Sequence, residues 1–89
     1  MSDLTEMWAA LEAYQPRADK AGYGDSWLKM TQERTTMAAL YAWACASSNA
    51  SKAASSAAWA VEATDMNQAE RYAARVIECI DRAMQEVKP

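Results

Sequence analysis

The side chains that could carry chemistry in this sequence are carboxylates, serines and two cysteines. The chain has 89 residues and no histidine. Acid–base catalysis would therefore depend on carboxylates, and these fall on what the sequence periodicity predicts to be exposed helix faces. The serines between positions 47 and 56 have no nucleophile elbow and no basic partner. Gly22 and Gly24 match neither GxGxxG nor a P-loop. We predict no enzyme activity, no catalytic residue and no cofactor.

The cysteines and the overall charge exclude further classes of function. Cys45 and Cys79 have no CxxC spacing, which argues against the common zinc sites, so we predict no metal. Two buried free thiols are expected, and the alternative is a Cys45–Cys79 disulfide between packed helices. The net charge of −3, with nine basic residues interspersed among twelve acids, argues against direct binding of nucleic acid.

No segment of the sequence resembles a signal peptide or a membrane span. The N-terminus is acidic and lacks a long apolar run. The longest apolar run, Met37 to Ala46, is too short to cross a bilayer. We therefore predict a cytoplasmic protein without membrane contact. If the protein is expressed inside a bacterial host cell, this compartment is the cytoplasm of that cell.

Residues 35–61, TTMAALYAWACASSNASKAASSAAWAV, must lie at the centre of the fold. This stretch has one charge, Lys52, and neither Gly nor Pro. Alanine and serine favour helix and let another helix approach closely, so bulky side chains elsewhere must fill the core. The chain has 21 alanines but only nine Leu, Ile and Val residues, which makes the apolar core thin. A homodimer would add core without adding length, and both a monomer and a homodimer remain open.

Caps and periodicity predict an all-α fold, a small bundle of three to four helices in a single domain, 1–89. Apolar residues at spacings of three and four begin after Ser2 or Asp3, and Pro16 must stop this helix, which gives 3–14. A flexible connector follows at 15–25, with room for one helical turn closed by Gly22.

Three further helices are expected at 26–48, 50–63 and 66–87. Ser47, Ser48 and Asn49 favour a break near 48–50, and the alternative is one long helix over 26–63. Asp65 and Gln68 form a capping pair for the last helix. Its apolar residues from Met66 to Val87 recur strictly at three and four residues. In the alternative structural role, the seam from Ala69 to Val87 would pair with a second copy of the chain.

The four tryptophans are the feature most open to a functional interpretation. In one interpretation all four fill space in the core between alanines. In the other, one or two are exposed and anchor a partner, since Trp, Tyr and Arg dominate binding hot spots. Trp43 and Tyr41 project from different faces of one helix, and a small domain can hardly cover both. The partner-binding candidates are Trp27, Tyr41 and Trp43, with four acidic residues that would complement a basic partner: Glu33, Glu62, Asp65 and Glu70.

The segments YAWACASSNASKAASSAAWAVEA at 41–63 and GDSWLKM…ERTTMAA at 24–39 resemble, in composition, small alanine-rich helical accessory proteins of bacteriophages and prophages. Proteins of that kind often inhibit host or defence proteins, anti-CRISPR and anti-restriction proteins among them. The resemblance implies such a role but no functional residue.

The sequence therefore favours a non-catalytic protein–protein interaction module. The concrete expectation is an inhibitor that blocks a bacterial host or defence protein. Its partner would be a bacterial protein, such as a nucleic-acid-handling complex with a basic surface. The alternative is a self-assembling structural helical bundle.

Overall fold

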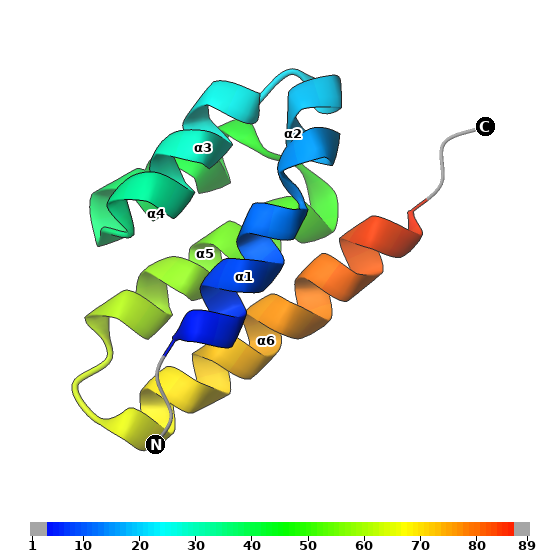
Figure 1. Ribbon diagram of the computed structural model, residues 1–89. Helices are drawn as coiled ribbons and strands as arrows, with labels where there is room; N and C mark the ends of the chain where they lie inside the picture. Colours follow the sequence, from blue (N-terminus) through cyan, green and yellow to red (C-terminus); the bar gives the residue numbers. More distant parts are fainter. Residues whose placement is uncertain (1–3, 87–89) are drawn as a thin grey trace.

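The computed structural model describes residues 4–86, which form six α-helices (Figure 1). The helices are α1 Thr5–Ala13, α2 Gln15–Ala21, α3 Gly24–Glu33, α4 Thr36–Cys45, α5 Ser48–Glu62 and α6 Met66–Gln85. The predicted all-α class is confirmed, and the predicted count of three to four helices is wrong. No described helix is long and apolar enough to cross a membrane.

The longest helices, α5 and α6, pack side by side and form the base of the bundle (Figure 1). Helix α1 packs on α6 and reaches α3, while α4 packs against α5 and α3. All six helices contribute buried residues to one hydrophobic cluster. The expected N-terminal helix over 3–14 corresponds to α1, although its predicted caps, Ser2 and Asp3, lie outside the described residues.

Helix α2 occupies the segment for which we expected a flexible connector, 15–25. Pro16 lies in its first turn, where a missing backbone N–H costs nothing. Gly22 ends α2 with a left-handed φ of 99°. Gly24 must also be glycine, because a Cβ there would overlap Asp19. The predicted turn closed by Gly22 is therefore present, extended into a seven-residue helix.

The expected helix 26–48 is broken into α3 and α4 at Arg34 and Thr35, and the alternative single helix over 26–63 is wrong. Arg34 adopts a left-handed φ of 57°, and its Nε donates to the carbonyl of Thr31 at 3.0 Å. Its guanidinium also binds Glu12 at 2.8 Å and lies 5.4 Å from the centre of the Trp8 ring. Thr35 then caps α4 by accepting the N–H of Ala38. Contacts of Arg34 with α1 thus stabilise the α3–α4 turn, which contains neither Gly nor Pro.

The break predicted near 48–50 falls at Ala46 and Ser47, where the backbone is extended. Helix α5 begins at Ser48, which has a positive φ of 57°. The helices predicted at 50–63 and 66–87 correspond to α5 and α6, and residue 87 lies outside the described part of the chain. Asp65 accepts the N–H of Gln68 at 2.8 Å, which confirms the predicted capping pair.

The core is built as the composition predicts, with an alanine-rich helix surrounded by large side chains. The alanines of α5 at 50, 53, 54, 57, 58 and 60 are at most 3 % exposed. The largest fully buried side chains come from the other helices: Met7, Leu11, Trp27, Met30 and Val76. Small residues on α5 allow α4 and α6 to approach it closely from two sides.

The described part of the α6 seam is covered by the chain's own helices. Ala69, Val76, Ile80 and Ala83 are buried, and α6 packs against α5 and α1. These residues leave no free apolar face on the seam for a second copy, which argues against self-association through α6. Met66, three residues before Ala69, is 51 % exposed.

Candidate protein-binding surface

Helix α4, TMAALYAWAC, is apolar around its whole circumference although one side of it faces solvent. Only Ala38, Ala39 and Ala42 are buried, so the helix packs on the bundle through three small residues. Its large side chains point outward: Met37, Leu40, Tyr41 and Trp43 are 77 %, 38 %, 58 % and 47 % exposed. A helix that is hydrophobic all round is normally buried on all sides, and exposed apolar patches of this kind mark interaction sites.

One side of α4 borders α5 and forms an aromatic surface with it. Thr36, Leu40 and Trp43 recur at four and three residues on this side, and Thr36 donates to Glu62 of α5 at 2.8 Å. Trp59 lies three residues before Glu62 on the same face of α5 and is 57 % exposed. Tyr72 of α6 stacks on Trp59, with ring centres 6.3 Å apart. We call Leu40, Trp43, Trp59 and Tyr72 the aromatic surface.

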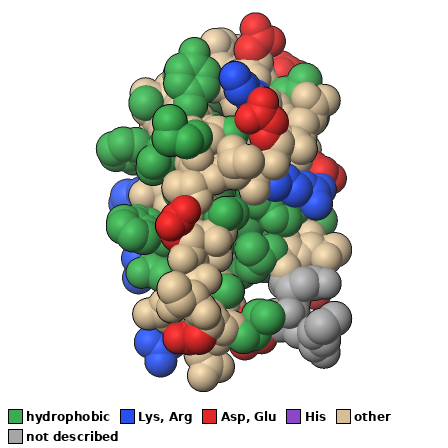
Figure 2. Space-filling view, turned by 90° about the vertical axis from the view of Figure 1, so that its left-hand side faces the viewer, with side chains coloured by type: hydrophobic (Ala, Val, Ile, Leu, Met, Phe, Trp, Pro, Cys, Tyr) green, Lys and Arg blue, Asp and Glu red, His purple; other side chains and the backbone are tan. Residues whose placement is uncertain are grey.

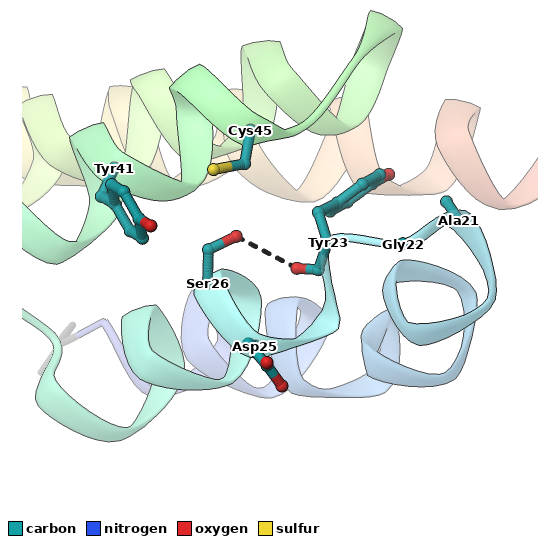
Figure 3. A pocket seen from close by; sticks show the side chains of 7 residues that line it. All are labelled: Ala21, Gly22, Tyr23, Asp25, Ser26, Tyr41 and Cys45. Carbon is teal, nitrogen blue, oxygen red and sulfur yellow. Dashed lines mark hydrogen bonds between the residues drawn. The ribbon is translucent and has the colours of Figure 1, made fainter.

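The other side of α4 borders a cleft of about 370 Å³ beside the α2–α3 turn. Tyr41 and Cys45 line it from α4, and Tyr23 and Ser26 line it from the turn and the start of α3 (Figure 3). The Ser26 hydroxyl donates to the Tyr23 carbonyl at 3.1 Å, so this wall is fixed. Asp25 belongs to the lining but projects away from the space between α3 and α4 (Figure 3). The interior of the cleft is therefore largely uncharged.

Figure 2 shows the side of the molecule that holds the α3–α4 turn and the α5–α6 loop. Hydrophobic side chains cover much of this side, and acidic and basic groups are scattered between them, in places next to each other (Figure 2). A protein-binding patch of this type has an apolar centre with charges at its edge.

The structure separates the predicted aromatic anchors. Trp43 and Tyr41 are both exposed, on the two sides of α4. Trp27 is fully buried, and its indole Nε1 donates to the Leu11 carbonyl at 2.8 Å. A side chain without exposed area cannot contact a partner, so Trp27 is removed from the set of candidate anchors.

The four predicted acidic residues are exposed but do not form one cluster. Glu33 ends α3 next to the start of α4, and Glu62 is bonded to Thr36, so these two flank the beginning of α4. Asp65 serves as the cap of α6. Glu70 lies one turn after Met66, on a face of α6 different from that of Tyr72. Only Glu33 and Glu62 are placed to complement a partner on α4.

Sequence reasoning missed Leu40, Trp59 and Tyr72 as parts of the aromatic surface. A signal for Trp59 was present, because Lys52, Ser55, Trp59 and Glu62 recur at three and four residues and mark the exposed stripe of α5. Tyr72 could not be found this way, since its role depends on the stacking of α6 against Trp59.

Metal-ligating and thiol side chains of the described residues lie apart from one another. The described residues contain no group of three His, Cys, Asp or Glu side chains that could hold a metal ion. The two cysteines are free; Cys79 is buried and Cys45 is exposed, so the expectation of two buried thiols is wrong for Cys45.

Tyr23 is the residue whose titration should be visible in the stability of the fold. Burial raises the pKa of Tyr23 above its ordinary value, and the hydrogen bond to the Tyr14 hydroxyl (2.9 Å) and the charges of Tyr14 and Glu86 raise this pKa further. An ordinary tyrosine titrates near pH 10. Above that pH the unfolded chain loses the Tyr23 proton before the folded chain does, so the free energy of unfolding should fall as pH rises.

Urea denaturation at pH 8 and at pH 11 measures this alkaline loss of stability. Tyr23→Phe should reduce the loss, because the substituted side chain cannot ionise in either state. Tyr41→Phe, measured at low protein concentration, is the matched control, since Tyr41 is well exposed in the single chain. Equal alkaline losses in wild type and Tyr23→Phe would show that Tyr23 titrates as in the unfolded chain.

The fold and the surface define a small all-α bundle with an apolar, uncharged helix on its outside. Comparisons of the chain with protein-family models, with curated proteins and with solved structures find no match. The function is therefore argued from the surface itself.

Proposed function

We propose that this chain is a non-catalytic interaction module that binds a partner protein through the aromatic surface. The observation that carries the proposal is the exposure of two tryptophans, Trp43 and Trp59, on adjacent helices. Trp and Tyr side chains supply large contact areas and dominate binding hot spots. Exposing Trp43 has no benefit for the fold, since α4 is anchored through alanines.

The charges beside this surface favour a partner with basic groups. Glu62 lies next to Trp59 on α5, and Glu33 lies at the other side of the start of α4. Lys52 is the basic residue on the exposed stripe of α5. A basic partner surface would be attracted to the end of α5 that carries Glu62.

The concrete form of the proposal is an inhibitor that acts in the bacterial cytoplasm by covering a surface of a host or defence protein. The compositional resemblance to phage and prophage accessory proteins supports this form. CRISPR–Cas and restriction enzymes are the kind of target considered, because they handle nucleic acids and present basic surfaces. A self-assembling structural bundle remains the alternative function, favoured by the uncharged outer face of α4.

The proposal is tested by expressing the chain in bacteria that carry a CRISPR–Cas or restriction system and measuring phage plaquing. Wild type should raise the plaquing efficiency in at least one defended strain. Trp43→Lys and Trp59→Lys should abolish the gain, because each places a charge in the aromatic surface.

Leu28→Lys is the matched control, since Leu28 is 44 % exposed on α3, outside this surface. Circular dichroism must show that all variants are folded. A gain that survives both tryptophan substitutions would contradict the assigned surface. Absence of any gain across the defended strains would contradict the inhibitor form of the proposal.

A further inference from the structure

The outer face of α4 carries a protruding side chain at one end and a recess at the other. Met37, in the first turn, is the most exposed large hydrophobic residue of the described chain at 77 %. Cys45, the last residue of α4, lines the 370 Å³ cleft. Tyr41 lies midway, four residues from each, so all three follow one side of the helix.

We propose that a second copy of the chain occupies this face, with the two α4 helices antiparallel across a two-fold axis near Tyr41. In a two-fold contact, if residue i meets residue j then j also meets i. An antiparallel pairing centred on Tyr41 sets Met37 of each copy against Cys45 and the cleft of the other. The protrusion and the recess lie eight residues apart, about 12 Å along the helix at 1.5 Å per residue.

The chemistry of the contact also suits a second copy. Methionine is flexible and fills irregular apolar recesses. The cleft is lined by small or uncharged groups such as Gly22, Ser26 and Cys45, and its one charged residue, Asp25, projects away from the space between α3 and α4. Because α4 has no charged residue, self-pairing places no like charges opposite each other on this helix. Ala44, beside Tyr41, is small and leaves room for the facing tyrosine.

A dimer would cover apolar surface that the monomer leaves in water. The chain has 89 residues and an alanine-rich core, and chains of this size often gain stability by association. The aromatic surface lies on the opposite side of α4, at Trp43, and stays accessible in each copy. The dimer does not depend on the proposed function, since the two use different sides of the helix.

The first experiment is sedimentation equilibrium of the full chain over a range from about 1 to 200 μM. Wild type should be a dimer in this range. Tyr41→Glu should raise the dimer dissociation constant at least about tenfold, as expected for a charge placed at the centre of an apolar contact. Trp43→Glu, on the other side of the same helix, should leave it within about threefold. Circular dichroism must show native helix content for both.

A cross-linking experiment tests the antiparallel geometry. Under mild oxidation Met37→Cys should form a covalent dimer, because its new thiol faces Cys45 of the other copy. Met37→Cys combined with Cys45→Ser should not, and wild type should not, since the two Cys45 residues lie at opposite ends of the contact. Cys79 is buried and does not compete.

Two outcomes would overturn the proposal: a strict monomer up to 200 μM, and a dimer unaffected by Tyr41→Glu. If the chain is a monomer and Tyr41→Glu loses a protein that wild type captures, this face belongs to that different partner. The dimer and the inhibitor function are tested separately. If Trp43→Lys abolishes the gain in plaquing efficiency but still forms the dimer, the two functions use different sides of α4.

Discussion

Replacing Trp27 with alanine should lower the free energy of unfolding by about 3–5 kcal/mol, the usual cost of deleting a buried aromatic side chain. Trp27 is fully buried, and its ring centre lies 5.0 Å from that of Tyr14 and 5.9 Å from that of Tyr23. The substitution also removes the indole donor from the Leu11 carbonyl, 16 residues away in sequence. Trp27 thus joins α1 to α3 and the α2–α3 turn, and no nearby side chain can fill its volume.

Urea denaturation followed by circular dichroism, at one protein concentration, measures this loss. Domains of this size have a total stability of about 5–15 kcal/mol, so the variant should be marginal or unfolded at 37 °C. Trp43→Ala is the matched control, because Trp43 is half exposed, and we expect a change below about 1 kcal/mol. Equal losses for the two substitutions would contradict the assignment of Trp27 to the core and Trp43 to the surface.

The second large effect concerns the alanines of α5. Ala54 has no exposed area, and α5 packs against both α4 and α6. Ala54→Leu adds three carbons where closely packed helices leave no space, so it should destabilise the fold by at least about 2 kcal/mol. The same substitution would raise stability if it filled a void.

Lys52→Leu on the same helix is the control for Ala54→Leu. It introduces the same side chain two residues earlier, on the exposed stripe of α5, and should change stability by less than about 0.5 kcal/mol. Thermal and urea denaturation of both variants give the comparison. An Ala54→Leu variant as stable as Lys52→Leu would mean that the alanines reflect helix propensity and not close packing.

Local signals in the sequence were sufficient to predict most helix ends. Pro16 separates α1 from α2, Gly22 ends α2 with a left-handed backbone, and Asp65 caps α6 through the N–H of Gln68. Each of these depends on residues within a few positions of one another. The i,i+4 ion pair of Glu78 and Arg82, at 2.9 Å, likewise depends on local spacing alone.

The turn at Arg34 and Thr35 could not be predicted in the same way. Its left-handed residue is an arginine, and the partners of that arginine, Glu12 and Trp8, lie on α1, more than 20 residues earlier. The three-and-four spacing continues on both sides of Arg34, and Arg34 is the one charged residue on that seam, which is why a single helix over 26–48 was expected. A contact between distant helices stabilised a break that local propensity does not favour.

The sequence by itself determined that this protein is all-helical, with an alanine-rich central segment, larger side chains around it and no recognisable catalytic motif. Only the tertiary structure decided that Trp43 is exposed. Trp8 and Trp27 are buried between α1 and α3, while Trp43 and Trp59 project from α4 and α5. For Trp43 the physical reason is that α4 is apolar around its whole circumference, so periodicity cannot choose its inner face; the neighbours that pack against α4 do so. For Trp59 the polar stripe of α5 is a local signal, but the stacking on Tyr72 is set by the packing of α6.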